Sequence, residues 1–296
     1  MIVLNGPAER LDGVVLSADG RFAATAGVRA PLWLWDLVAG SRLPLAADVV
    51  PQSRNAYDFS PDGRWLAVAG SRGLSLFDTS TGRATVTVEF RRPWQAAEAV
   101  RFLSARRLVA ATEGFGKFDG DLTVFDVRGG RLGPGRVTAD NLGPVTALAL
   151  TPDRRTLVTH AAEWLDVWDA RTMRQRAHWP LGAIRDRPVV VSLDGTLVVL
   201  FRRTFVHVLD ATGGRDAAVV SGAGRRWVQA AAFTPDGRSL AVVGGSDAVR
   251  FFDTTTWRER TAFAWGVGEL RGVAFTADGL RGVACSATGR VVVWDM

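Results

Sequence analysis

One short pattern, an apolar run closed by an aromatic residue or leucine and then aspartate, occurs seven times in this 296-residue chain. The copies are Trp35-Asp36, Phe77-Asp78, Phe125-Asp126, Trp168-Asp169, Leu209-Asp210, Phe252-Asp253 and Trp294-Asp295. Successive aspartates are separated by 42, 48, 43, 41, 43 and 42 residues. A period near 42 residues that runs from end to end predicts a repeat architecture. We therefore expect one domain over residues 1–296, although length alone would suggest about two.

A second motif precedes the first in most copies, and it has the composition of a tight turn. Proline fixes φ, aspartate bonds its own backbone, and glycine tolerates positive φ. Short β-branched and aromatic runs lie between the turns, which predicts strands a, b, c and d in each copy. The turn motifs are Ser17-Ala-Asp-Gly20, Ser60-Pro-Asp-Gly63, Thr151-Pro-Asp153, Ser192-Leu-Asp-Gly195, Thr234-Pro-Asp-Gly237 and Thr276-Ala-Asp-Gly279.

Four short strands form a sheet that cannot bury both of its faces alone. Neighbouring copies must stack against it, and radial stacking produces a β-propeller. The first strand-like run, Ile2-Val-Leu4, precedes the first strand a, and the chain ends just after the last strand c. We therefore expect residues 2–5 to supply strand d of the last blade, formed by 272–296. This closure would remove exposed sheet edges that invite aggregation.

The combination of motifs resembles the WD40-repeat family over essentially the whole chain. The resemblance is carried by Ser/Thr-Pro-Asp-Gly, by the terminal Trp-Asp and by small-residue b strands such as Ala67-Val-Ala-Gly-Ser71 and Val242-Val-Gly-Gly-Ser246. It implies an all-β fold, a seven-bladed propeller with four antiparallel strands per blade. The chain resembles a divergent bacterial-type member of that family.

Several family features are missing. The family's Gly-His dipeptide, whose histidine joins a buried network with a turn aspartate, a strand-b hydroxyl and the strand-c tryptophan, does not occur. Only Trp35, Trp168 and Trp294 fill the tryptophan position, and the turn aspartate is recognisable at Asp247 and less clearly at Asp121. We therefore expect apolar packing to replace most of this network.

The composition and the N-terminal sequence argue against a membrane protein and a secreted protein. No window holds the ~18 uncharged apolar residues that a membrane helix needs, and the N-terminus lacks the features of a secretion signal. We expect a cytoplasmic protein with no membrane contact, in which the single cysteine, Cys285, is a small buried residue. The net charge is +6, and Lys117 is the only lysine among 36 basic residues. This arginine bias is consistent with acidic partners or with GC-rich codon usage, and we favour codon usage.

The predicted central channel, lined by strand a of each blade, offers few groups for catalysis. A calcium site takes 6–8 oxygen ligands and a zinc site needs histidine or cysteine, which this set does not supply. No phosphate loop or catalytic motif occurs, so we expect no cofactor, no metal and no catalysis. The alternative is an enzyme or small-molecule site at the channel mouth around Asp58 and Arg101. The channel candidates are Tyr57, Asp58, Arg101, Thr146 and Gln229.

The histidines and one acidic tract contain residue types that can bind metals, but their spacing does not match a metal site. The three histidines, His160, His178 and His207, do not converge in the sequence, and surface or packing roles are the simpler interpretation. The acidic, glycine-rich tract 113–121 does not match EF-hand spacing. We interpret it as an enlarged b–c loop, which accounts for the single 48-residue step.

The d–a and b–c loops of a propeller share one face, here called the top face, and in this chain they are rich in arginine and tryptophan. Such residues on a rigid scaffold are typical of binding hot spots. We expect a non-catalytic scaffold, monomeric on its own, that binds a protein or peptide there. Interleaved acids such as Glu98, Asp186 and Glu269 argue against nucleic acid. A further alternative is a sensor or scaffold domain of a larger signalling protein. The candidate partner-binding residues are Arg92, Trp94, Arg226, Trp227 and Arg271.

Overall fold

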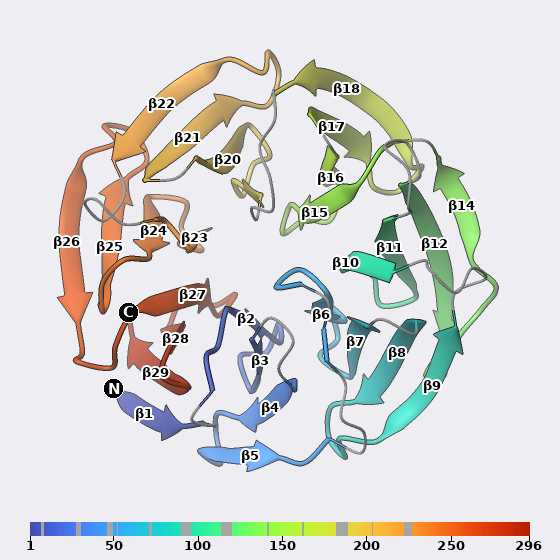
Figure 1. Cartoon of the computed structure of the whole chain (residues 1–296), viewed down its shortest axis with the longest axis horizontal. Helices are drawn as coiled ribbons and strands as arrows, with labels where there is room; N and C mark the ends of the chain where they lie inside the picture. Colours follow the sequence, from blue (N-terminus) through green and yellow to red (C-terminus); the bar gives the residue numbers. More distant parts are fainter. Residues whose placement is uncertain are drawn as a thin grey trace.

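The repeated runs and turns form seven antiparallel sheets around a common axis (Figure 1). This architecture, in a computed structural model, confirms the predicted seven-bladed β-propeller. Among the described residues, no helix is long and apolar enough to cross a membrane. The structure describes residues 1–6, 9–27, 31–45, 50–51, 53–70, 73–89, 96–113, 120–140, 142–161, 163–181, 189–202, 204–221 and 227–296.

Blades 1 to 3 occupy the part of the ring coloured blue to green in Figure 1. Strand a lies nearest the axis, and each later strand lies one step farther out. Blade 3 differs because two short strands, β13 and β14, both pair with its strand c. Blade 1 comprises β2 (Gly13–Leu16), β3 (Phe22–Ala26), β4 (Trp33–Asp36) and β5 (Ser41–Leu43); blade 2 comprises β6 (Tyr57–Phe59), β7 (Trp65–Gly70), β8 (Gly73–Asp78) and β9 (Ala84–Glu89); blade 3 comprises β10 (Ala96–Ser104), β11 (Arg107–Glu113), β12 (Asp121–Arg128), β13 (Arg131–Leu132) and β14 (Arg136–Ala139).

Blades 4 to 7 complete the ring from green to red, and blade 7 takes its fourth strand from the N-terminus. Blade 4 comprises β15 (Val145–Leu150), β16 (Thr156–Ala161), β17 (Trp164–Asp169) and β18 (Arg174–Pro180); blade 5 comprises β19 (Val190–Val191), β20 (Leu197–Arg202), β21 (Phe205–Asp210) and β22 (Asp216–Ser221); blade 6 comprises β23 (Ala230–Phe233), β24 (Ser239–Val243), β25 (Ala248–Asp253) and β26 (Glu259–Ala264); blade 7 comprises β27 (Leu270–Phe275), β28 (Arg281–Ser286), β29 (Arg290–Asp295) and β1 (Ile2–Asn5).

The turn between strands a and b is held by its own side chains. In blade 2 the Ser60 hydroxyl donates to Asp62 Oδ1 at 2.5 Å and accepts the Trp65 N–H at 2.9 Å, while Gly63 adopts a φ of 69°. The same hydroxyl–carboxylate bond occurs in five other blades. The sequence motif therefore acts as a local device that reverses the chain and sets the register of strands a and b.

Apolar side chains fill the spaces between blades. The cluster between blades 2 and 3, for example, joins Trp65 and Leu76 to Phe102, Leu108 and Phe125, all at most 6% exposed. Because each blade contributes both faces to such clusters, no sheet retains its core without its neighbours.

Ring closure follows the predicted arrangement. β1 pairs antiparallel with β29, with Ile2 opposite Val293 and Leu4 opposite Val291. Leu4 is 7% exposed and packs against Leu11 and Trp35 of the neighbouring blade region. The first strand of the chain therefore covers the outer edge of the last blade.

We predict that Leu4→Ala destabilises the ring and that Val3→Ala does not. Removing the buried Leu4 side chain should cost an amount at the lower end of the ~2–5 kcal/mol range for such truncations. Val3 is 37% exposed, so its truncation should change the free energy of unfolding by less than about 0.5 kcal/mol. Urea denaturation of both variants measures the difference. Deletion of residues 1–5 should produce aggregation, and an unchanged melting curve would contradict closure by β1.

We also predict a loss of stability in acid. Thr172 donates a backbone and a hydroxyl hydrogen bond to Asp169, and with Arg176 these lower the pKa of that carboxyl from 3.8 to about 2. The folded state therefore binds fewer protons than the unfolded state, so this stabilisation is complete above about pH 4 and is lost as the pH falls toward 2. Asp58, whose pKa burial raises, acts in the opposite direction. The pKa is also lowered at Asp36, Asp78, Asp153, Asp194, Asp210, Asp236, Asp253 and Asp278.

Thermal unfolding followed by circular dichroism at a series of pH values checks this expectation. The thermal unfolding midpoint should decrease as the pH is lowered below about 4. Asp169→Asn should make this decrease smaller, because the variant lacks one titrating carboxyl. A midpoint that stays constant down to pH 2 would contradict it.

Candidate functional site

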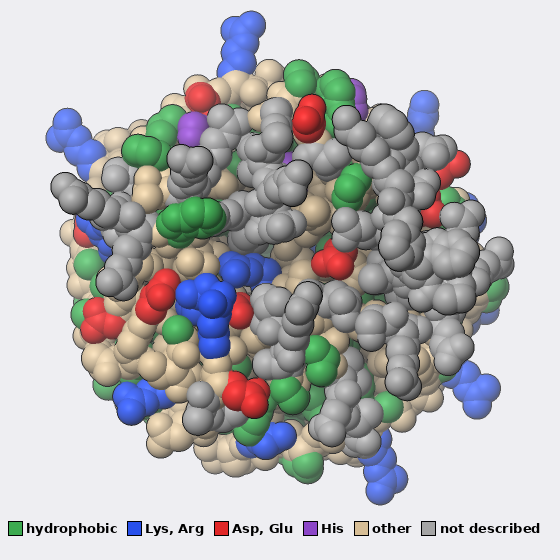
Figure 2. All heavy atoms as spheres, viewed as in Figure 1, with side chains coloured by type: hydrophobic (Ala, Val, Ile, Leu, Met, Phe, Trp, Pro, Cys, Tyr) green, Lys and Arg blue, Asp and Glu red, His purple; other side chains and the backbone are tan. Residues whose placement is uncertain are grey.

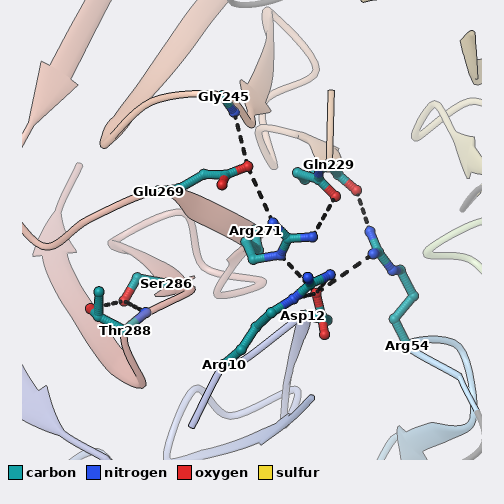
Figure 3. A network of polar contacts seen from close by, with 9 residues as sticks. All are labelled: Arg10, Asp12, Arg54, Gln229, Gly245, Glu269, Arg271, Ser286 and Thr288. Carbon is teal, nitrogen blue, oxygen red and sulfur yellow. Dashed lines mark hydrogen bonds and ion pairs between the residues drawn. The ribbon is translucent and has the colours of Figure 1, made fainter. Parts of the chain in front are cut away.

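Side chains at the beginnings of the innermost strands meet at the top-face mouth of the channel (Figure 3). Asp12 precedes β2, Arg54 lies shortly before β6, Gln229 precedes β23, and Arg271 lies in β27. Because these strands line the axis, residues from blades 1, 2, 6 and 7 come within reach of one another. Arg10, Asp12, Arg54, Gln229, Glu269 and Arg271 are called the mouth network below.

Asp12 is the centre of the mouth network. Arg271 Nε donates to Asp12 Oδ1 at 2.7 Å, and Arg10 Nε donates to the same oxygen at 2.8 Å. Arg54 Nη2 lies 3.9 Å from it. The Asp12 side chain is 3% exposed and that of Arg271 9%, whereas that of Arg10 is 53% exposed. The Asp12–Arg271 pair is thus buried, and Arg10 covers it from the solvent side.

Other members of the network tie distant blades together. Arg54 of blade 2 donates from Nη1 to the Gln229 carbonyl of blade 6 at 2.6 Å. The Gln229 side-chain oxygen accepts from Arg271 Nη2 at 3.2 Å, and Glu269 accepts from Arg271 Nη1 at 3.2 Å. Burial lowers the pKa of Arg54, and the charge of Asp12 opposes this effect. Arg54 therefore spans part of the channel mouth, with Asp12 as a nearby opposite charge.

A second set of contacts continues around the mouth through blades 3 and 4. Arg101 Nη2 donates to Asn55 Oδ1 at 3.2 Å, and Asn55 Nδ2 donates to the Thr146 carbonyl at 3.4 Å. The Thr146 hydroxyl lies 3.0 Å from His160 Nδ1. The Ser53 hydroxyl donates to the Glu98 carbonyl at 2.5 Å. Together with the mouth network, side chains from six of the described innermost strands or their leading segments are therefore held by contacts between blades.

β-Bulges occur at three positions in this region. The register between strands a and b shifts at Glu98 in blade 3, at Thr146 in blade 4 and at Arg271 in blade 7. A bulge inserts one unpaired residue and re-aims its side chain. The bulges lie at equivalent positions near the start of strand a, which is where the contacts between blades form.

The sequence-based placement of Arg271 in an exposed loop is wrong. It lies at the second position of β27 and is 7% exposed, because its bulge turns the guanidinium toward Asp12 rather than toward solvent. Trp227, by contrast, lies immediately before the buried Val228 and is 53% exposed on the top face. Arg92, Trp94 and Arg226 lie outside the described residues, so their predicted roles stay predictions.

The alternative site contains Asp58 and Arg101, which lie within electrostatic reach of each other. Burial raises the pKa of the Asp58 carboxyl, and the charges of Arg101 and Arg154 oppose the increase. Burial lowers the pKa of Arg101, and Asp58 opposes that decrease. Asp58 Oδ2 already accepts the Phe102 N–H at 2.8 Å, and Arg101 Nη1 donates to the Val100 carbonyl at 2.7 Å. The side chains of both Asp58 and Arg101 are therefore hydrogen-bonded to the backbone of β10.

Tyr57 does not line the channel as expected. It is completely buried in the cluster between blades 1 and 2, because alternation along β6 turns Tyr57 toward blade 1, while Asp58 contacts Phe102 of blade 3. Burial raises the pKa of its phenol. Thr146 and Gln229, the other two channel candidates, are partly exposed members of the contacts at the mouth.

The three histidines make different local contacts. His160 is buried, His178 contacts Asp166 at 2.6 Å and stacks on Trp164, and His207 contacts Asp216 at 3.3 Å. Within the described part of the chain, no three His, Cys, Asp or Glu residues form a potential metal site. Cys285 is fully buried, and desolvation raises its pKa to about 12, so it is an unreactive thiol.

Sequence reasoning missed Asp12, Arg10 and Arg54 as site residues. The available signal was their position: each lies just before an innermost strand, where opposite charges from different blades can meet. Position before an innermost strand does not by itself show which charges pair. The pairs are defined only when the ring brings blades 1, 2, 6 and 7 together.

Comparison with protein-family models and with curated proteins finds no match for this chain. The fold and the site together define a seven-bladed β-propeller whose top-face channel mouth is tied by hydrogen bonds and ion pairs between blades.

We predict that Arg271→Ala destabilises the protein far more than Arg10→Ala. Loss of Arg271 leaves the buried Asp12 carboxylate without its buried cationic partner, which typically costs about 3–5 kcal/mol. Arg10 is more than half exposed, so its loss should cost about 1 kcal/mol or less. Chemical denaturation measures both values. Equal effects of the two substitutions would contradict the central role of the buried Asp12–Arg271 pair.

Proposed function

We propose that this protein is a non-catalytic scaffold that binds a protein or peptide partner on its top face. The observation that carries the proposal is Trp227, a large aromatic side chain that is 53% exposed beside the mouth network. Exposed tryptophan next to arginine on a rigid surface is a typical binding hot spot. On the face seen in Figure 2, basic and acidic side chains lie beside one another near the middle, so a partner would meet both charges.

The backbone around Trp227 is firmly held. The Gln229 N–H donates to the Val243 carbonyl at 2.8 Å, and the Gln229 side chain and carbonyl accept from Arg271 and Arg54. Gly244, with a φ of 136°, packs so closely that a Cβ there would lie 2.5 Å from the Trp227 carbonyl oxygen. A preorganised backbone loses little entropy when a partner binds, which favours affinity.

Arg92, Trp94 and Arg226 belong to the same proposed surface by their position in d–a connections of the sequence. Arg271 is not exposed on this surface, but it donates a hydrogen bond to the Gln229 side chain, which lies two residues after Trp227. A catalytic or small-molecule site around Asp58 and Arg101 is the weaker hypothesis, because both groups are engaged by the backbone of β10. We also propose a cytoplasmic, monomeric scaffold, and its role as a sensor or scaffold domain of a larger signalling protein stays an alternative.

Membership of the WD40-repeat family is part of the proposal. Trp35 Nε1 donates to the Thr25 hydroxyl at 2.9 Å, and Trp168 Nε1 donates to the Thr159 hydroxyl at 3.0 Å. These strand-c to strand-b bonds reproduce one part of the buried network that the resemblance implies. They support the family assignment in the blades that keep both residues.

The test is recovery of a partner by the intact chain and by two single variants. Trp227→Ala removes an exposed aromatic side chain of the top face and should reduce recovery of the bound protein about tenfold or more. Leu280→Ala is the matched control, since Leu280 is 66% exposed in the a–b turn of blade 7 on the opposite face. Quantitative pull-down from cells that express the native protein provides the measurement.

Undiminished recovery with Trp227→Ala, or an equal loss with Leu280→Ala, would contradict a partner site at this position. Both variants should melt at the temperature of the unmodified protein, because each side chain is largely exposed.

A further inference from the structure

The bottom face, formed by the a–b and c–d turns, has one blade with different turn chemistry. In six blades a serine or threonine hydroxyl donates to an aspartate in the a–b turn at 2.5–2.6 Å. In blade 3, Ser104 pairs with Arg107 across a two-residue turn, and Arg106 occupies that turn. The Ser104 hydroxyl accepts the Arg106 N–H at 3.2 Å. A positive side chain therefore replaces a negative one at this position.

The c–d turn of blade 3 also differs. β12 continues past Asp126 to Arg128, and Gly129 and Gly130, with φ values of 56° and 76°, form a tight hairpin to β13. A Cβ at Gly130 would lie 2.5 Å from the Trp65 ring, so the hairpin packs closely against blade 2. In the other blades that have a c–d turn, the corresponding aspartate accepts bonds from its own turn, at Asp36, Asp78, Asp169, Asp210 and Asp253.

These changes surround a hollow of about 680 Å³ between blades 2 and 3. Four arginines line it, together with two aspartates, which leaves an excess of two positive charges. One of the aspartates, Asp62, already accepts the Ser60 hydroxyl at 2.5 Å. The arginines are Arg64, Arg106, Arg107 and Arg128.

The two aspartates offset only half of the four positive charges that the described residues bring to the hollow. Arg107 donates to the Arg171 carbonyl of blade 4 at 2.9 Å. The salt bridges found among the described residues do not include Arg64, Arg106 or Arg128. Arg64 lies over the Trp65 ring, with its guanidinium carbon 4.9 Å from the ring centroid, which holds one cation at the edge of the hollow.

We propose that this hollow, called the arginine pocket below, binds an acidic peptide segment of a partner protein. Guanidinium groups bind carboxylates with paired, charge-assisted hydrogen bonds, and clustered arginines recognise acidic motifs in this way. Arg106 and Arg128, both exposed and on neighbouring turns of blade 3, face the pocket from one side, and Arg64 faces it from blade 2. The site is separate from the proposed top-face surface and does not depend on it.

The same features favour an acidic peptide over nucleic acid. Asp62 and Asp126 would repel a continuous phosphate backbone, whereas a peptide can place its carboxylates between them. Base stacking needs an exposed aromatic ring, and Trp65, the aromatic residue that lines the pocket, is only 6% exposed.

The experiment measures binding of a fluorescent ten-residue oligoglutamate peptide to the intact chain by anisotropy at low salt. The test variant is Arg106→Glu/Arg128→Glu, which reverses two exposed charges of the pocket. The matched control is Arg155→Glu/Arg238→Glu, which changes the net charge equally at exposed turn residues of blades 4 and 6. We expect the unmodified chain and the control to bind alike within about threefold, and the test variant to bind at least about tenfold more weakly. Circular dichroism confirms that both variants are folded.

Two further ligands in the same assay distinguish carboxylate peptides from phosphopeptides and from nucleic acid. A peptide of the same length with phosphoserine in place of glutamate should bind at least as well, since phosphate also pairs with guanidinium. A single-stranded oligodeoxynucleotide should bind more weakly than the peptide, and its binding should not depend on Arg106 and Arg128. No measurable binding of the glutamate peptide, equal loss in both double variants, or preferred binding of the oligonucleotide through Arg106 and Arg128 would each overturn the proposal.

Discussion

Pairing of β1 with β29 closes the ring, and the rest of the structure depends on that closure. Leu4 completes the apolar cluster that joins blade 7 to blade 1, and the same junction brings Arg271 to Asp12. Seven blades can share their faces only in a closed circle, because a sheet at an open end would leave its apolar side chains and backbone edge in water. Strands from the two ends of the chain therefore determine the geometry of the mouth network in the middle of the top face.

The two faces of the ring are built by different physical means. The bottom face consists of turns that satisfy their own polar groups, as Ser60, Asp62 and Gly63 do in blade 2. The top face is held by contacts between blades, such as that of Arg54 with Gln229. Repetition makes the bottom face uniform, so its single departure in blade 3 becomes informative. In the described part of the top face the contacts differ from blade to blade, and Trp227 is notable there for its exposure beside a rigid network.

Local pattern was enough to predict some residues and insufficient for others. The turn motifs and the strand-c residues behave as expected because their bonds lie within a few positions of one another, as in Thr276 and Asp278. Arg271 was misplaced because a bulge, which depends on pairing with β28, decides where its side chain points. Tyr57 was misplaced because the face of β6 that lines the axis is set by blade packing and not by the polarity of the side chain.

The sequence by itself determined the number of blades, the order of strands within them and the closure by residues 2–5, because a repeated spacing and local turn chemistry specify these features. The tertiary structure alone decided which charges meet. Asp12 and Arg271 are far apart in the chain, yet they form a buried pair at 2.7 Å, and Arg64 and Arg128 come to line one hollow from different blades. Electrostatic contacts depend on distance in space, and only the closed ring brings these residues within that distance.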